Sequence, residues 1–460
     1  MRVTTFAALL GCAAMGCSWT RFTDIGENRP VVVLKKPTTG FEAGFGVNVT
    51  PLALADKQSR VLVGQAPGQH RAATFDLGVG TEPNTEAIDS SSCDPSQDLD
   101  PCYLADKVAG LPLVHIGLPE LERMCFVLGV GKSERAEKAG LIGRCQDFVN
   151  FTFGVPASVQ SKLVQEVFAN RRPEPLVLAT DKGVLPAFAA GAMSQELAWF
   201  YRPRSTVPVE LVAPGSADEG YGAAVAVLRL EPDSGTAEDG SPETLGRRLV
   251  AVGAPGAGHV WLFGAETGQA VGCLGGIEGL GRTLASGRVD DDDVDDLVMA
   301  DKTNVTVISG AALSGLTPAA VIECTLGALP AGAVIASFGC GSADNTAGCP
   351  GGFGDSLDVG DLDGDGDGEV VVGAPGMTVR GHPGAGAVSI YDAEGDDPAY
   401  LSDQLFLSSV EDNERLGAAL GAAHITGRDI IVAGAPGGTR TALFYCSVLV
   451  PPDKAGARCQ

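Results

Sequence analysis

The sequence predicts an all-β protein, and more specifically a seven-bladed β-propeller. Seven similar segments recur along the 460 residues, and their matching positions lie 47 to 74 residues apart. Repeats of this length indicate one supersecondary unit that is repeated in space. Apolar and polar residues alternate within the segments, with glycine and proline at their ends, whereas helical periodicity is scarce outside residues 155–170. About four strands per unit, arranged radially, leave only short sheet edges.

Each clear repeat begins with an aromatic residue or leucine followed by glycine, and a later apolar strand ends near a glycine or alanine that we call the anchor. The fullest copy is FGDSLDVGDLDGDGDGEVVVGAPG, residues 353–376. Clear repeats lie near residues 45–68, 221–263, 280–310, 353–392 and 416–446, and weak ones near 106–132 and 153–185. The anchors are Gly64, Gly129, Ala179, Gly253, Ala300, Gly373 and Gly434. We expect one propeller domain over residues 30–460, in which residues 30–34 pair with residues 441–446.

The fullest repeat contains an acidic loop in which carboxylates alternate with small residues, and Gly366 permits a sharp turn in it. Calcium prefers oxygen ligands, and alternating carboxylates on a tight loop can converge on one point. Carboxylates this close in sequence repel one another, so a bound Ca²⁺ explains the cluster better than a solvated hairpin tip does. The acidic side chains that would bind the ion are Asp361, Asp363, Asp365 and Glu369.

These motifs resemble the FG-GAP repeat family, the seven-bladed propeller of integrin α-subunit heads and of many bacterial surface proteins. The resemblance covers roughly residues 40–445 and is closest at residues 353–376. It implies a calcium site in the loop between the first two strands of a blade, bound through loop positions one, three, five and nine and a main-chain carbonyl at seven. Carried over, the ligands are Asp361, Asp363, Asp365, the carbonyl of Asp367, and Glu369. Glutamate at position nine departs from the usual aspartate but keeps the charge.

A second loop of this kind, residues 288–296, departs further from the pattern. Asp290, Asp292 and Asp296 occupy positions three, five and nine, whereas Arg288 replaces the first ligand and Asp293 replaces the turn glycine. An arginine in the ligand ring would compete with the metal, and its charge would be compensated by pairing with Asp291, Asp293 or Asp295. Whether this loop binds calcium is left open by the sequence.

The amino terminus predicts export. Arg2 precedes a short apolar run that is typical of a signal peptide, residues 1–17, and residues 18–29 would form a linker. Cys17 is the preferred site of lipid attachment, with Cys12 and an ordinary cleaved signal as alternatives. We therefore expect a protein tethered to a bacterial outer membrane or cell surface, or in the periplasm, by a lipid anchor.

Ten cysteines remain after the signal segment, an even number that suggests disulfides in an oxidising compartment. A zinc site is the rival interpretation, but no Cys-x-x-Cys spacing occurs. Short spacings suggest the pairs Cys93–Cys102, Cys125–Cys145, Cys340–Cys349 and Cys446–Cys459, which leaves Cys273 with Cys324.

Charge and motif content limit the function. The net charge of −25 and the pI near 4.5 argue against nucleic-acid binding, which requires a basic face. The five histidines are scattered, and neither a Gly-x-Ser-x-Gly nor a His-Glu-x-x-His motif occurs. The sequence therefore favours a non-catalytic, calcium-binding platform for a protein or glycan. A polysaccharide lyase or hydrolase, and a purely structural envelope component, are the alternatives.

Overall fold

The computed structural model describes the strands and most of the carboxy-terminal half of the chain. The described residues are 31–35, 44–52, 60–64, 72–76, 85–88, 114–115, 125–130, 140–145, 150–153, 177–181, 187–193, 196–202, 205, 207–214, 219–232, 234, 246–318, 322–325, 331–339, 351–362, 364–392, 401–407, 409–425, 428–438 and 440–444.

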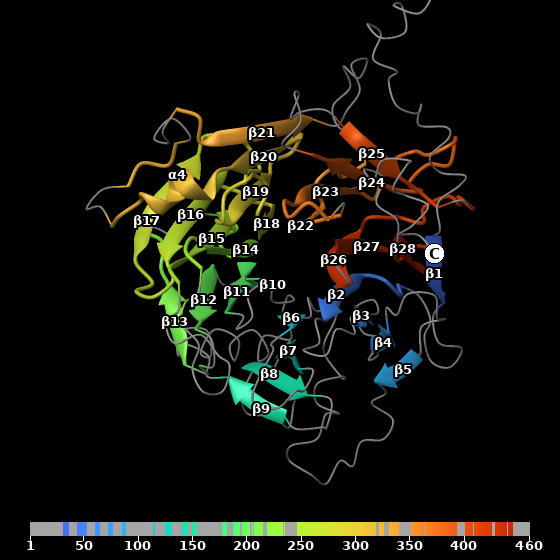
Figure 1. The fold of residues 1–460 in the computed structure, drawn as a ribbon, viewed down its shortest axis with the longest axis horizontal. Coiled ribbons are helices and arrows are strands. Elements are labelled where there is room, and N and C mark those ends of the chain that lie inside the picture. Colours follow the sequence, from blue (N-terminus) through green and yellow to red (C-terminus); the bar gives the residue numbers. More distant parts are fainter. Residues whose placement is uncertain are drawn as a thin grey trace, which may run out of the picture.

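The described strands form seven antiparallel sheets of four strands each, arranged around a common centre (Figure 1). We number the sheets along the chain. Sheet 1 contains β2 (Asn48–Leu52), β3 (Arg60–Gly64), β4 (Ala72–Asp76) and β5 (Thr85–Ile88), and sheet 2 contains β6 (Val114–His115), β7 (Cys125–Val130), β8 (Gly140–Cys145) and β9 (Asn150–Phe153). Sheet 3 contains β10 (Val177–Thr180), β11 (Phe188–Ala192), β12 (Leu197–Tyr201) and β13 (Pro208–Leu211), and sheet 4 contains β14 (Ala224–Arg229), β15 (Arg248–Ala254), β16 (His259–Gly264) and β17 (Ala270–Gly275). Sheet 5 contains β18 (Thr283–Gly287), β19 (Asp296–Ala300), β20 (Asn304–Ile308) and β21 (Val334–Gly339), and sheet 6 contains β22 (Ser356–Gly360), β23 (Glu369–Ala374), β24 (Ala387–Tyr391) and β25 (Leu401–Leu405). Sheet 7 contains β26 (Ala419–Ile425), β27 (Arg428–Ala435), β28 (Arg440–Phe444) and β1 (Val31–Lys35).

The first strand of each sheet lies nearest the centre and contacts the first strand of the next sheet. This is the radial arrangement predicted from the repeats, and the all-β fold is that of a β-propeller. The expected pairing between the two ends of the chain is present, because β1 pairs with β28 in antiparallel register, Val31 opposite Phe444. Sheet 7 is therefore built from both ends of the described chain.

The core lies between neighbouring sheets rather than in one central cluster. Val252 and Phe263 of sheet 4 pack with Phe200 of sheet 3, while Leu249 and Leu262 pack on the other side with sheet 5. Side chains alternate between the two faces of a strand, and here both faces are covered. This explains why β15 reads as an almost unbroken apolar run and is buried along its whole length.

Three of the anchor glycines, Gly253, Gly373 and Gly434, pack against the backbone of the next sheet. A Cβ atom placed on Gly253 would lie 1.9 Å from the carbonyl oxygen of Gly281, which opens sheet 5 with a positive φ of 83°. The same contact joins Gly373 to Gly417 at 2.2 Å and Gly434 to Gly46 at 1.9 Å. Glycine recurs at these places because the sheets approach too closely for a side chain.

The placement of the weak third repeat is wrong. Ala179 lies in β10, the first strand of sheet 3, whereas the other anchors lie in second strands, and Phe153 ends sheet 2. The true anchor of sheet 3 is Gly191 in β11, whose hypothetical Cβ would lie 2.4 Å from the carbonyl oxygen of Gly222. The second weak repeat is placed correctly at its anchor, since Gly129 lies in β7.

Helical structure is minor in the described residues. The helix α4 (Gly310–Ser314) is capped by the side chain of Ser309, which accepts a hydrogen bond from Ala312 N. The segment 155–170, where helical periodicity was noted, lies outside the described residues. None of the helices that the structure describes is both long and apolar enough to cross a bilayer.

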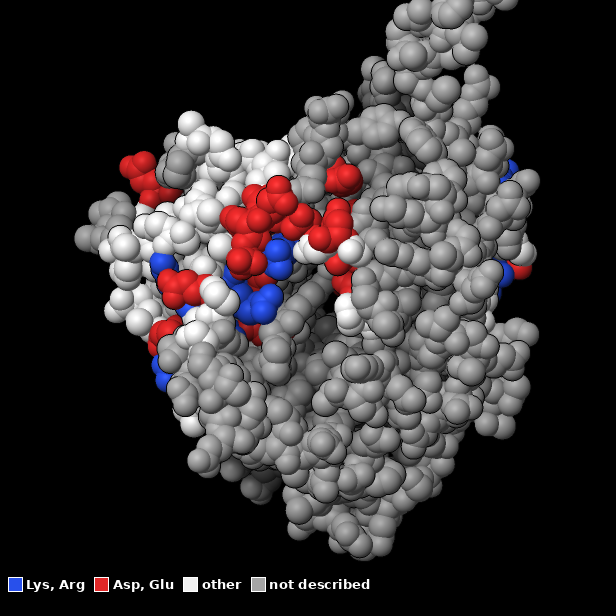
Figure 2. Space-filling model, in the orientation of Figure 1, with Lys and Arg blue, Asp and Glu red and all other residues white. Residues whose placement is uncertain are grey.

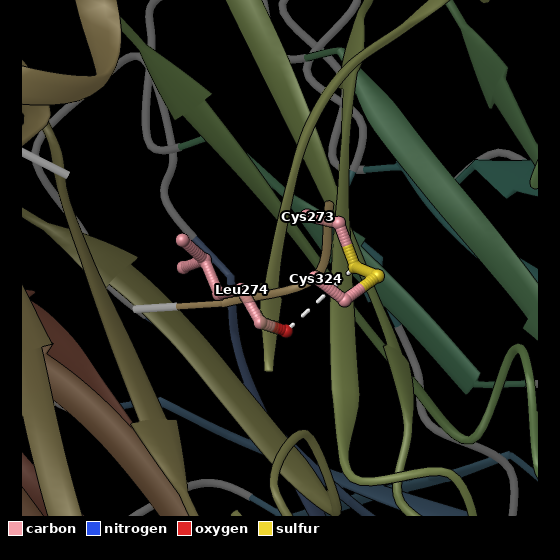
Figure 3. Close-up of a disulfide and its surroundings, with 3 residues drawn as sticks. All are labelled: Cys273, Leu274 and Cys324. Atoms are coloured by element: carbon pink, nitrogen blue, oxygen red, sulfur yellow. Dashed lines mark hydrogen bonds between the residues drawn. A yellow bond between two sulfur atoms is a disulfide. The ribbon is translucent and has the colours of Figure 1, made fainter. Parts of the chain in front are cut away.

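One expected disulfide is present in the described part of the chain. Cys273 on β17 is bonded to Cys324, which lies between α4 and β21 (Figure 3). Cys125 and Cys145 are directly opposite one another in the pairing of β7 with β8. The remaining cysteines, Cys12, Cys17, Cys93, Cys102, Cys340, Cys349, Cys446 and Cys459, lie outside the described residues.

Replacing both Cys273 and Cys324 with alanine is expected to lower the free energy of unfolding by about 3 kcal/mol. The bond spans 51 residues of sequence, and removing it restores conformational freedom to the unfolded chain. Denaturant unfolding of the oxidised wild type and the double variant measures the difference. A loss below about 1 kcal/mol would mean that the packing around β17 holds this segment without the bond.

Candidate metal centre

Two acidic loops join the first strand to the second in neighbouring sheets. Residues 288–296 connect β18 with β19 in sheet 5, and residues 361–369 connect β22 with β23 in sheet 6. We call them loop 5 and loop 6. In the space-filling view, acidic side chains gather beside a few basic ones on the face around the centre (Figure 2).

Loop 5 brings its three predicted acidic ligands together. The carboxylates of Asp290, Asp292 and Asp296 each offer an oxygen, and these oxygens all lie within 4.8 Å of one another. Asp296 is fully buried and accepts hydrogen bonds from Val289 N and Gly310 N, both at 2.8 Å. Backbone donors therefore fix the orientation of the ninth-position carboxylate.

The electrostatics of loop 5 favour a cation. The pKa of Asp296 is raised to about 7, first by burial and also by the charges of Asp290 and Asp292, while the two backbone hydrogen bonds act in the opposite direction. Burial also raises the pKa of Asp292, with Asp290 adding to the effect. The loop thus holds Asp292 and Asp296 where their ionised forms are disfavoured, and a bound cation would reverse that preference.

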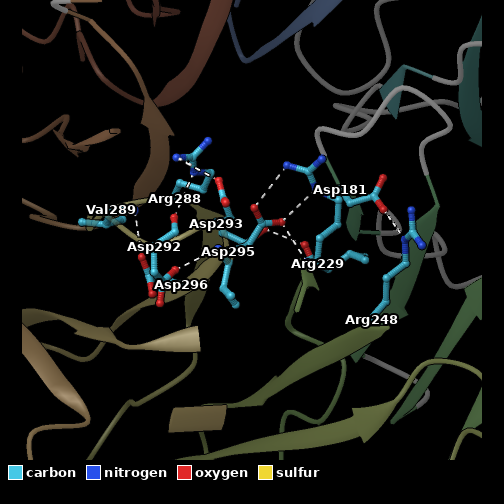
Figure 4. A network of polar contacts seen from close by, with 12 residues as sticks. Asp181, Arg229, Arg248, Arg288, Val289, Asp292, Asp293, Asp295 and Asp296 are labelled. Carbon is cyan, nitrogen blue, oxygen red and sulfur yellow. Dashed lines mark hydrogen bonds and ion pairs between the residues drawn. The ribbon is translucent and has the colours of Figure 1, made fainter. Parts of the chain in front are cut away.

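Arg288 does not enter this group of carboxylates. Its Nε donates to the carbonyl of Asp292 at 3.1 Å, and its Nη2 lies 3.5 Å from Asp293 Oδ1 and 3.8 Å from Asp367 Oδ1 of loop 6. The guanidinium at the first loop position thus contacts Asp293 and Asp367, and its charge also opposes the rise in the pKa of Asp292 that burial causes (Figure 4). The expected pairing with Asp293 is present.

Loop 6 has the same backbone framework as loop 5. Glu369 Oε2 accepts from Leu362 N at 2.7 Å, just as Asp296 accepts from Val289 N. Asp365 Oδ1 accepts from Asp367 N at 3.1 Å, which matches the hydrogen bond from Val294 N to Asp292 Oδ1 in loop 5. These equivalent hydrogen bonds indicate that the two loops have similar backbone conformations.

In the described part of loop 6, Asp361, Asp365 and Glu369 do not form a group whose carboxylate oxygens all lie within 4.8 Å of one another, unlike the three aspartates of loop 5. Asp361 Oδ1 accepts from Gly364 N at 2.6 Å, and Gly366 has a φ of 112°, as the expected turn glycine requires. Burial raises the pKa of Asp361, and the nearby charges of Asp365 and Asp429 add to the effect. Burial likewise raises the pKa of Asp367, supported by Asp291 and opposed by Arg288. Asp363 lies outside the described residues.

The donors fit calcium rather than zinc. Both loops offer carboxylate and carbonyl oxygens, which hard cations prefer, whereas structural zinc is bound mainly by cysteine and histidine. His259, Cys273 and Cys324 also lie together, but the two sulfur atoms are joined in the disulfide and offer no thiolate.

Sequence reasoning missed a set of contacts that join neighbouring sheets. They connect the end of a first strand to the residue before or at the start of the following sheet's second strand (Figure 4). Buried Asp181 of sheet 3 pairs with Arg248 of sheet 4 at 2.5 Å, and Asp295 Oδ2 of sheet 5 accepts from Arg229 N of sheet 4 at 2.8 Å. The expected pairing of Asp295 with Arg288 is therefore replaced by one with Arg229, at 3.4 Å.

A sequence signal for these contacts existed. The paired residues are separated by 67 residues in Asp181–Arg248 and by 66 in Arg229–Asp295, which is about one repeat. Searching for opposite charges one repeat apart would have found both pairs.

The sheets and their acidic loops define a propeller-type protein with candidate cation sites on one face. Residues 353–391, which cover loop 6 and its flanking strands, match the model of the FG-GAP repeat. The chain therefore contains an FG-GAP repeat, and the predicted resemblance is confirmed at this place. A search of curated proteins finds no match to the chain.

Proposed function

We propose that this chain is a non-catalytic, calcium-binding platform of the cell envelope that recognises a protein or glycan through loops on one propeller face. The observation that carries the proposal is the convergence of Asp290, Asp292 and Asp296 within 4.8 Å, on a backbone framework that loop 6 repeats. Calcium would hold both loops in shape and leave neighbouring loops positioned for a partner.

The proposed calcium ligands lie in the two acidic loops. In loop 6 they are Asp361, Asp363, Asp365, the carbonyl of Asp367 and Glu369, and in loop 5 they are Asp290, Asp292 and Asp296. Bound calcium would supply positive charge where these carboxylates repel one another. Glu369 and Asp296 would remain oriented by the backbone N–H groups of Leu362 and Val289.

The proposed location follows from the amino terminus. A signal peptide at residues 1–17 and lipid attachment at Cys17, or at Cys12, would place the propeller on an outer membrane, at the cell surface or in the periplasm. The Cys273–Cys324 disulfide supports an oxidising compartment. No nucleic-acid partner is proposed, because the net charge is −25.

Calcium is expected to raise the melting temperature of the chain in a saturable way, and a chelator is expected to reverse the rise. For one loop with a dissociation constant of about 1 mM, 10 mM calcium would add about 1.4 kcal/mol to the free energy of unfolding. Thermal unfolding in calcium and in chelator measures the effect.

Asparagine variants assign the effect to the loops. Asp290→Asn with Asp292→Asn, and Asp361→Asn with Asp365→Asn, should each remove part of the calcium-dependent rise. The exposed Glu278→Gln, which removes a charge between β17 and β18 where Glu278 pairs with Lys302, serves as the control for a lost charge. Equal melting temperatures in calcium and chelator for the wild type would refute the calcium-binding proposal.

A further inference from the structure

We infer that Asp429 of sheet 7 is a positioning residue for the calcium site of loop 6. The inference rests on the proposed function, since it concerns that same site. It assigns a role to a residue outside the loop, and it makes calcium binding in sheet 6 depend on the contact with sheet 7.

Asp429 forms two hydrogen bonds with the backbone of Asp361, the first ligand position of loop 6. Its Oδ2 accepts a hydrogen bond from Asp361 N at 3.1 Å, and its own N–H donates to Asp361 O at 2.6 Å. Asp361 is the position-one ligand, so these two bonds fix where its side chain starts. A ligand held before the metal arrives loses less conformational freedom on binding.

The carboxylate of Asp429 is itself held in place. Its other oxygen, Oδ1, lies 3.0 Å from His424 Nδ1, and only 16% of the side chain is exposed. It also lies close enough to Asp361 for its charge to raise the pKa of that side chain. A fixed negative charge next to a carboxylate ligand repels it in the empty site and attracts a cation once one is bound.

An equivalent backbone hydrogen bond joins other neighbouring sheets, but there the accepting residue, which follows or ends a first strand, is not a candidate ligand. Asp295 N donates to Arg229 O at 2.9 Å, and Gly368 N donates to Arg288 O at 2.7 Å. In both cases the residue that is held is an arginine. Among the described contacts of this kind, the one between Asp361 and Asp429 holds the backbone of a residue whose side chain is a proposed calcium ligand.

The contact with Asp429 also involves sheet 7, which contains the first and the last described strands of the chain. Asp429 belongs to β27, whose neighbour β28 pairs with the amino-terminal strand β1. Calcium in loop 6 is therefore expected to stabilise the contact between sheet 6 and the sheet that unites the two ends.

The test measures calcium binding by isothermal titration calorimetry in a chain that carries Asp290→Asn and Asp292→Asn, so that loop 6 is the site observed. In this parent chain, Asp429→Ala is expected to raise the dissociation constant for calcium by about tenfold or more. Asp429→Asn keeps an acceptor for Asp361 N and is expected to give a smaller rise. A residue that served stability alone would leave the dissociation constant unchanged.

Asp355→Asn is the matched control. Asp355 lies in sheet 6 at the other end of β22, where it pairs with Arg282 at 2.5 Å, so the variant removes one charge away from loop 6. It should leave the dissociation constant within about twofold of the parent. Equal dissociation constants for the parent and Asp429→Ala would overturn the inference and leave the proposed function intact. Absence of calcium binding in the parent would overturn both for loop 6.

Discussion

Asp181→Asn is expected to lower the free energy of unfolding by about 3–5 kcal/mol, because it removes the buried carboxylate that pairs with the guanidinium of Arg248. Both side chains are inaccessible to solvent, and Arg248 Nε donates to Asp181 Oδ2 at 2.5 Å. Asp181 Oδ1 also accepts from Ala187 N at 2.9 Å. Chemical unfolding of the wild type and the variant measures the loss.

The two halves of this ion pair should differ in their response to pH. Burial raises the pKa of Asp181, while Arg248 and the Ala187 amide act in the opposite direction. In Arg248→Met the lowering effect of the guanidinium is gone, so the folded pKa of Asp181 lies further above its unfolded value. Stability of that variant is therefore expected to be greatest at acidic pH, where Asp181 is protonated, and to fall as the pH rises. Asp181→Asn is not expected to gain stability at acidic pH, because Arg248 stays protonated over this range.

A matched control separates the effect of breaking a buried ion pair from the effect of losing one charge. Glu278 and Lys302 form an ion pair whose side chains are 82% and 60% exposed, and Glu278→Gln should cost less than about 1 kcal/mol. If Asp181→Asn cost no more than this control, Arg248 would have found another partner or water. The contact between sheets 3 and 4 would then not depend on this ion pair.

The sequence predicts those features of the fold that each repeat must contain. Gly281 and Gly253 recur because the backbone of one sheet contacts the backbone of the next, and this requirement is local enough to leave a motif. Sheet 3 was misplaced because its first strand, Val177–Thr180, is as apolar as a second strand and is followed by Asp181. Its true anchor, Gly191, is followed by Ala-Met rather than Ala-Pro.

The candidate site was predictable in its ligands but not in its surroundings. Positions three, five and nine of loop 5 follow from spacing, and the structure brings Asp290, Asp292 and Asp296 together. The direction of Arg288 depends on Asp367 of the next sheet, which spacing within one loop does not reveal. The role of Asp429 was likewise hidden, since it lies 68 residues from Asp361.

Gly253→Ala is expected to lower the free energy of unfolding by about 3 kcal/mol, because the new methyl group would clash with a backbone carbonyl. The hypothetical Cβ lies 1.9 Å from Gly281 O, and this atom cannot move without shifting the start of sheet 5. In sheet 5 itself, Ala300 occupies the anchor position with its Cβ near Gly354, so Ala300→Gly should cost only about 1 kcal/mol.

The same experiment tests which residue anchors sheet 3. Gly191→Ala should resemble Gly253→Ala, because its hypothetical Cβ lies 2.4 Å from Gly222 O. Ala179→Gly, at the position that the sequence favoured, should resemble Ala300→Gly. A mild Gly191→Ala together with a severe Ala179→Gly would reverse this assignment. Severe effects at Gly253 and Gly191 alone would show that contact between the backbones of neighbouring sheets, rather than the Gly-Ala-Pro sequence, is what selects glycine at these positions.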